Sequence, residues 1–168
     1  MGYDMLEFIQ NNFKYRDGFI YRTVCRGGES VGKRAGYLTV CNGKPYWKVS
    51  VMRKTVYLHH VIFLLHYKHL PKYIDHADGD STNNRIENLR AATQSQNIAN
   101  SKIRSNNTSG YKGVTLRKDT GKWNASVMVN GKHISLGSYV DKEEAYKAYM
   151  AGSRKYFGEF AREGKATL

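Results

Sequence analysis

Residues 75–97 read DHADGDSTNNRIENLRAATQSQN, and this stretch decides how the middle of the chain folds. The residues that lead into it favour a strand ending in a tight turn at Asp78-Gly79. Further along, Thr93 is followed three residues later by Gln96, which is the spacing of a capping box at the start of a helix. The stretch therefore predicts a strand, a turn, a second strand and a helix.

Three polar residues of this stretch suit the cleavage of a phosphodiester bond. A strand–turn–strand–helix unit folded back on itself can bring Asp75, His76 and Asn97 to one place. A carboxylate and an amide oxygen can hold a hard divalent cation. A neutral imidazole, with an ordinary pKa of about 6.5, can take a proton from an attacking water. The alternative is a plain strand-end polar pair with ordinary turn and capping asparagines.

The pattern consists of Asp75-His76, then Asn88, then Asn97. It resembles the HNH endonuclease motif, above all as found in the subgroup of phage and intron-associated homing endonucleases. The resemblance implies that His76 is the general base and that Asp75 and Asn97 are metal ligands. It also implies that Asn88 braces the loop and holds the histidine, and that His59 supports the site. Many HNH enzymes have histidine where Asn97 stands, so the resemblance favours one Mg²⁺ or Mn²⁺ ion per site over zinc.

The flanking sequence predicts an α+β fold in separate parts. Asn42-Gly43 is a strong hairpin signal within a β-rich N-terminal segment, and HHVIFLLHYKH at residues 59–69 predicts a short buried helix. SKIRSNNTSG at residues 101–110 has the composition of a flexible connector. We expect a β-rich segment leading into a ββα-metal core, then a separate three-stranded antiparallel sheet packed on one helix. The predicted domains are 1–57 (β-rich, DNA-contacting), 58–101 (nuclease core), 102–110 (linker) and 111–168 (DNA-binding).

The C-terminal part predicts three strands and a helix that begins at Asp141, with Glu144 at capping-box spacing. Its motifs resemble the plant ethylene-response-factor (Apetala-type) DNA-binding domain: YKGV at 111–114, WNA at 123–125, LGSY at 136–139 and EEAYKAY at 143–149. The resemblance implies a sheet that enters the major groove. The residues we expect to contact DNA are Arg117, Lys118, Lys122, Trp123, Ser126, Met128 and Lys132. The alternative is a solvated basic surface with Trp123 in the core.

The composition indicates a polyanionic partner. Lys and Arg number 27 against 14 Asp and Glu, a net charge of +13, and neutralising phosphates releases counterions. No apolar run is long enough to span a membrane, and the first residues lack the pattern of a secretory signal. Cys25 and Cys41 are too few for a four-ligand zinc site. We expect a cytoplasmic protein, in a bacterial host if phage-encoded, with no small-molecule cofactor.

Three functions compete at this point. The first is a site-selective, metal-dependent endonuclease acting on double-stranded DNA as a monomer or weak dimer. One catalytic set per chain predicts a nick from a monomer, and a double-strand break would need a dimer or two sequential nicks. The second is a sequence-specific DNA-binding regulator that has lost activity. Intact Asp75, His76, Asn88 and Asn97 argue against it. The third is an RNA-binding protein, which the charge permits but no stacking-platform motif supports.

Overall fold

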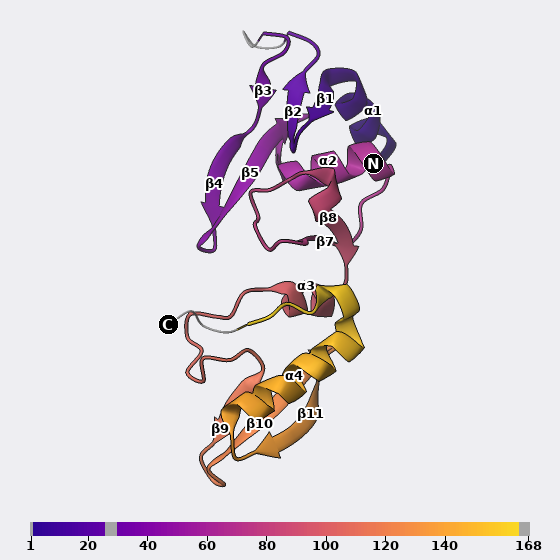
Figure 1. The fold of residues 1–168 in the computed structure, drawn as a ribbon. Helices are drawn as coiled ribbons and strands as arrows, with labels where there is room; N and C mark the ends of the chain where they lie inside the picture. Colours follow the sequence, from indigo (N-terminus) through magenta and orange to yellow (C-terminus); the bar gives the residue numbers. More distant parts are fainter. Residues whose placement is uncertain (1, 26–29, 165–168) are drawn as a thin grey trace. The chain divides into compact units, whose positions relative to one another are not determined.

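The computed structural model describes residues 2–25 and 30–164, and the chain forms two compact units, Met1–Ala91 and Ala92–Leu168. Within the described residues the fold is mixed, with four α-helices and several small antiparallel sheets (Figure 1). This agrees with the expected α+β class. The finer assignment of a ββα-metal core and the four-part domain division remain predictions.

The first unit begins with a helix that the β-rich expectation for residues 1–57 omitted. Helix α1 (Gly2–Asn12) buries Ile9 completely, and Met5 and Leu6 pack against the same core. These apolar residues lie three and four positions apart, so they share one face of a helix. The aromatic and β-branched runs that indicate strands start only at Phe13.

Two three-stranded antiparallel sheets follow, each with its strands in chain order. Strands β1 (Phe13–Arg16), β2 (Phe19–Arg22) and β3 (Arg34–Ala35) form the first sheet, and β4 (Tyr37–Cys41), β5 (Lys44–Val51) and β6 (Lys54–Tyr57) form the second. The predicted hairpin turn at Asn42-Gly43 is confirmed, because it joins β4 to β5 with φ angles of 50° and 74°. Both angles are positive, as a tight hairpin turn that matches the strand twist requires.

Helix α2 (Leu58–Tyr67) lies at the centre of the first core. Leu58 and Ile62 are fully buried against residues of α1, β2 and β5. The predicted buried helix is thus confirmed, but it ends at Tyr67, because Lys68 adopts a left-handed conformation with a φ of 61°. Beyond it, β7 (Tyr73–His76) and β8 (Leu89–Ala92) form a two-stranded sheet, with the 3₁₀ turn η1 (Ile86–Asn88) before β8.

The second unit contains helix α3 (Gln94–Asn100). The predicted capping box is confirmed: the Thr93 hydroxyl accepts from the backbone N–H of Gln96, and the Gln96 side chain accepts from the backbone N–H of Thr93. The segment 101–110, predicted to be a connector, is tied by side-chain hydrogen bonds. The Asn107 amide donates to the Tyr111 carbonyl at 3.0 Å and accepts from the Gly110 N–H at 2.7 Å.

A three-stranded antiparallel sheet backed by one helix completes the second unit (Figure 1). Its strands, in the order β11-β10-β9, are β9 (Val114–Arg117), β10 (Lys122–Val129) and β11 (Lys132–Tyr139), followed by α4 (Lys142–Phe157) and the 3₁₀ turn η2 (Gly158–Phe160). Asp141 caps α4 by accepting from the N–H groups of Glu143 and Glu144. Ala125 and Val127 of the central strand are buried with Tyr149 of α4 in the second core. The sheet and helix match the expected architecture.

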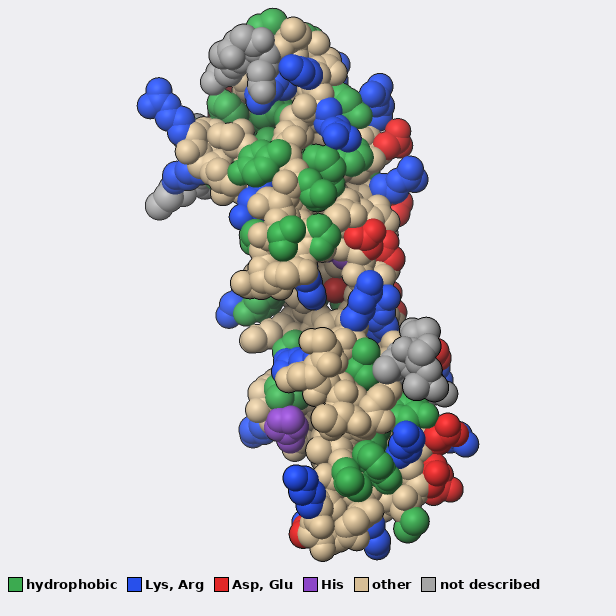
Figure 2. All heavy atoms as spheres, turned by 90° about the vertical axis from the view of Figure 1, so that its left-hand side faces the viewer, with side chains coloured by type: hydrophobic (Ala, Val, Ile, Leu, Met, Phe, Trp, Pro, Cys, Tyr) green, Lys and Arg blue, Asp and Glu red, His purple; other side chains and the backbone are tan. Residues whose placement is uncertain are grey.

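The described surface carries its basic charge on both units. In Figure 2, lysine and arginine side chains are spread over each unit between hydrophobic patches. One of the exposed apolar stretches runs along β4, where Leu38 is 52% and Val40 69% exposed. Among the described helices, none has the length and apolarity needed to cross a membrane.

Candidate functional site

The loop between β7 and β8 is held in shape by Asn88. Its side-chain oxygen accepts from the backbone N–H of Asp78 at 3.0 Å. Its amide nitrogen donates to the Asp78 carboxylate at 2.9 Å and to the Asn83 carbonyl at 2.8 Å. The Asn88 carbonyl accepts from the N–H of Ala77, immediately after β7. The side chain of Asn88 thus joins the start and the later part of the loop, and its carbonyl fixes the chain directly after His76.

His76 closes strand β7 and is only 8% exposed. Its Nε2 atom lies 3.2 Å from the side-chain oxygen of Asn84, which is itself 1% exposed. Burial lowers the pKa of His76, although its bond to Asn84 and the nearby carboxylates of the loop oppose the shift. The imidazole is therefore neutral at neutral pH, the state in which it can accept a proton.

A cluster of rings extends from His76 into the first unit. The ring of His59 is 5.0 Å from that of His76 and 4.5 Å from that of His60, both edge-on, and it stacks on Tyr57 at 5.3 Å. Burial lowers the pKa of His59 to about 2, and the neighbouring histidines add to the effect. Burial also lowers the pKa of His60. His59 therefore packs directly against the histidine that it was predicted to support.

Asp75, the residue before His76, lies 4% exposed and forms an ion pair with Arg90 of β8. The Arg90 Nε atom donates to a carboxylate oxygen of Asp75 at 2.9 Å. The pair crosses the β7–β8 sheet, so it also ties the two strands together. Sequence reasoning did not identify Arg90 or Asn84. An arginine next to a leucine on a strand, or an asparagine in a loop, carries no signal of its partner.

Two further acidic residues, Asp78 and Asp80, lie in the loop between β7 and β8. Asp78 accepts from the backbone of Asp80 at 2.8 Å and from the amide of Asn83 at 2.7 Å. Burial opposes ionisation of Asp78, but these hydrogen bonds and that from Asn88 outweigh it and lower its pKa. Asp80 in turn accepts from the backbone N–H and the hydroxyl of Thr82. Both carboxylates thus shape the loop.

The last predicted metal ligand, Asn97, belongs to the second unit. It lies in α3, half-buried, with its backbone N–H bonded to the Thr93 carbonyl at 3.0 Å. The predicted set therefore divides between the units: Asp75, His76 and Asn88 come from the first and Asn97 from the second. That Asn97 joins Asp75 at one ion remains a prediction.

The residues agree chemically with a hard cation. Within residues 2–25 and 30–164 no three His, Cys, Asp or Glu side chains gather in a way that could hold a metal. A site made from one carboxylate, one amide oxygen and water does not need such a group, because Mg²⁺ keeps several water ligands. Asp75 and Asn97 are predicted to supply these two kinds of oxygen. Cys25 and Cys41 are both free thiols, and two cysteines are too few for a four-thiolate site.

The predicted DNA-contacting residues of the second unit lie on two sides of the sheet. Ser126 alternates with the buried Ala125 and Val127, so it lies on the face opposite α4. Trp123, in contrast, packs against the core, which is the alternative considered for it. Lys118, Lys122 and Lys132 are exposed, as are Arg117 and Met128.

Asn124 of the central strand β10, on the sheet face opposite α4, was not predicted to contact DNA. Its side-chain oxygen lies 3.4 Å from the Ser138 hydroxyl and 3.5 Å from the Ser135 hydroxyl on β11. Arg117 pairs with Asp119 at 2.6 Å on an exposed turn, so its charge is partly neutralised. The face opposite α4 is therefore rich in amide and hydroxyl groups, and lysines lie at its strand ends.

Comparison with known proteins assigns the family. Residues 56–99, which include α2, β7, β8 and most of α3, match the HNH endonuclease family. Protein 3.8 of Escherichia phage T7 is 37% identical over 95 residues, which cover 55% of this chain and 78% of that protein. No solved structure matches the chain. The chain therefore belongs to the same family as Protein 3.8 of Escherichia phage T7, and it carries an HNH endonuclease domain at residues 56–99.

Proposed function

We propose that this protein is a metal-dependent, site-selective endonuclease that hydrolyses phosphodiester bonds in duplex DNA, of the homing type found in phages and mobile elements. The observation that carries the proposal is the position of His76: a buried, neutral imidazole beside the Asp75 carboxylate, inside the residues that match the HNH endonuclease family. The net charge of +13 supports DNA as the substrate.

The contacts of His76 suggest which of its ring nitrogens acts as the base. An amide oxygen can only accept a hydrogen bond, so the contact with Asn84 puts the ring hydrogen on Nε2. Nδ1 then keeps the lone pair that takes the proton of the attacking water. The buried ring of His59 and the loop braced by Asn88 hold the imidazole in one orientation.

Asp75 and Asn97 are the residues that would hold the divalent ion, Mg²⁺ or Mn²⁺. When bound, such an ion supplies the positive charge that stabilises the phosphate and the leaving oxygen during cleavage. Arg90 orients the Asp75 carboxylate through its 2.9 Å contact. On this account Asp75 binds, Arg90 and Asn88 position, and His76 moves the proton.

The ion pair also favours a second candidate function. A guanidinium already neutralises Asp75, as would suit an HNH domain that no longer binds a metal and serves a DNA-binding regulator. The two candidates differ in one property, which is turnover with a divalent cation.

Incubation of the full chain with supercoiled plasmid tests the proposal. We expect open-circle product with Mg²⁺ or Mn²⁺, none in EDTA, and recovery when the cation is restored. Sequencing of the product ends should place the nicks at a restricted set of positions. If the protein binds duplex DNA but cleaves it at no cation concentration, the nuclease hypothesis is rejected in favour of the DNA-binding regulator.

A further inference from the structure

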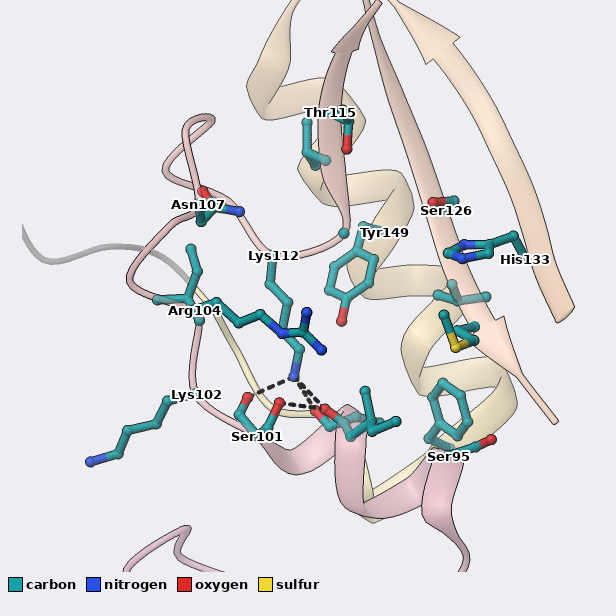
Figure 3. Close-up of a pocket in the computed structure, with 18 of the residues that line it drawn as sticks. Ser95, Ser101, Lys102, Arg104, Asn107, Lys112, Thr115, Ser126, His133 and Tyr149 are labelled. Atoms are coloured by element: carbon teal, nitrogen blue, oxygen red, sulfur yellow. Dashed lines mark hydrogen bonds between the residues drawn. The ribbon is translucent and has the colours of Figure 1, made fainter. Parts of the chain in front are cut away.

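A cavity of about 430 Å³ lies entirely within the second unit (Figure 3). It is bounded by α3, the segment 101–108, the start of β9, the later part of β10, and α4. Its volume falls in the roughly 300–1,000 Å³ range of pockets that bind small molecules or single residues of a polymer. The metal site proposed above does not use this cavity.

The lining combines an apolar floor, a polar rim and positive charge. Ile98, Met128 and Phe157 contribute apolar surface, and among residues 2–25 and 30–164 no Asp or Glu lines the cavity. The basic side chains in its wall are Lys102, Arg104, Lys112 and His133. A hollow that offers apolar contact next to unopposed positive charge suits a ligand with a flat apolar part and an anionic part.

Lys112 is already used by the fold. Its ammonium donates to the carbonyls of Ile98, Ala99 and Ser101 at 3.0, 2.6 and 2.6 Å, where α3 ends. These bonds appear as dashed lines in Figure 3. Burial lowers the pKa of Lys112 to about 8. Lys112 therefore fixes the wall of the cavity, and its donors are directed at the backbone.

Of the described Lys and Arg side chains that line the cavity, Arg104 is the one that remains for a ligand. Its side chain extends over the cavity toward Lys112 and Tyr149, whereas that of Lys102 points away (Figure 3). Among the described residues the side chains of Arg104 and Ser126 have no ion-pair or hydrogen-bond partner; only their backbones are bonded, the Arg104 carbonyl to the Asn107 N–H and the Ser126 N–H to the Gly113 carbonyl. A guanidinium binds a phosphate in two-pronged fashion and stacks on flat rings.

The cavity also adjoins the sheet face opposite α4. Ser126 and Met128 of β10 and His133 of β11 line the cavity, and Met128 is paired with His133 in the sheet. DNA lying on that face would thus have the cavity at one end of its path. The wall between β9 and α4 leaves no spare room: a Cβ on Gly113 would lie 2.0 Å from the Tyr149 ring.

We propose that this cavity binds one nucleotide unit, with the phosphate at Arg104 and the base on the apolar floor beside Ser126. A nucleotide displaced from a DNA strand and a free nucleotide offer the same chemistry. The proposal rests on the proposed function for its choice of DNA, but not on catalysis. Base contacts of this kind depend little on the nucleotide sequence and increase the affinity for an unpaired strand.

Binding to the full chain tests the proposal by two-dimensional NMR of the backbone amides. The probes are deoxyadenosine monophosphate, inorganic phosphate, a short single strand and a fully paired duplex with blunt ends. We expect saturable shifts at Gly113 and Ser126 with the nucleotide and with the single strand, and weaker or no shifts there with phosphate alone. Stronger binding of the single strand than of the monophosphate identifies a strand as the source.

Arg104→Gln and Lys102→Gln form a matched pair, because each removes one positive charge from the same segment. We expect Arg104→Gln to weaken binding of the monophosphate at least tenfold and Lys102→Gln less than twofold. An equal loss in both variants, equal shifts with inorganic phosphate, or no shift at Gly113 and Ser126 overturns the proposal. Plasmid nicking by the same samples separates the two hypotheses: nicking without nucleotide binding rejects only the cavity, and binding without nicking rejects only the nuclease.

Discussion

The Nε2 atom of His76 lies 3.2 Å from the side-chain oxygen of Asn84, and both residues are buried. The contact fixes the tautomer of the imidazole that we propose as the general base. It joins the end of β7 to the middle of the following loop. The orientation of the base therefore depends on a loop asparagine outside the four motif positions.

Replacing Asn84 by Asp should move the pH dependence of cleavage. A carboxylate in this position stabilises the protonated imidazole and raises the pKa of His76, so we expect the acidic limb of the rate profile to shift to higher pH. Asn84→Ala should lower the rate roughly three- to tenfold, in keeping with the loss of one hydrogen bond. Plasmid nicking between pH 5 and 9 measures both. A purely structural role for Asn84 would lower the rate of both variants with the profile unmoved.

Removing Arg90 should destabilise the first unit. Arg90→Gln removes the ion pair between Arg90 and the buried Asp75 carboxylate, and breaking a buried pair costs about 3–5 kcal/mol. Chemical denaturation without metal measures the free energy of unfolding, with the exposed Arg85→Gln as control, which we expect to change it by less than about 0.5 kcal/mol. Added Mg²⁺ should restore part of the loss in Arg90→Gln, because a cation can then balance Asp75. Equal stability of the two variants would argue against this view of the pair.

Acid should unfold the protein in part through His59. Its pKa in the folded state is about 2, against 6.5 ordinarily, so below pH 6.5 the unfolded chain binds a proton that the folded chain does not. Stability is thus full above pH 6.5 and falls as the pH drops toward 2. At pH 5 the cost is about 2 kcal/mol.

The comparison of His59→Gln with His69→Gln tests this linkage. We expect His59→Gln to lose about 2 kcal/mol less than the wild type between pH 7 and pH 5. His69 is exposed, so its variant should follow the wild type. Parallel pH–stability curves for all three proteins would show that His59 does not bear this cost.

Lysines at the strand ends of the second unit should carry phosphate contacts. We expect Lys122→Ala combined with Lys132→Ala to weaken duplex binding and to make the salt dependence of log K shallower by about 2, one for each contact. Lys142→Ala with Lys155→Ala, on α4, removes the same charge from the helix. Fluorescence anisotropy at several salt concentrations measures the slopes. An identical change in both double variants would reduce the effect to net charge.

Local signals in the sequence predicted the local structure well. The Asn42-Gly43 turn and the Thr93 capping box depend on residues next to one another, and both formed as predicted. Contacts between distant residues left no such trace. The pair of Asp75 with Arg90 arises because β7 and β8 lie side by side, and the bond of His76 to Asn84 because the loop between these strands folds back onto β7. No spacing rule specifies either contact.

The packing of the segment around residues 101–110 was equally hard to predict. A run rich in Ser, Asn and Gly at residues 101–110 indicated a linker, yet these residues belong to Ala92–Leu168. Lys112 accounts for the difference, because its ammonium binds the carbonyls at the end of α3 and so fastens that helix to the sheet unit. Composition could not show this, since a lysine in a polar segment normally faces solvent.

The most direct test of the central claim is the nicking rate of His76→Ala in Mg²⁺. We predict a rate at least 100-fold below that of the wild type, as expected for the loss of a general base, with the Kd for duplex DNA changed less than twofold. Cleavage by His76→Ala at the wild-type rate would contradict the account, because it would place the proton transfer elsewhere.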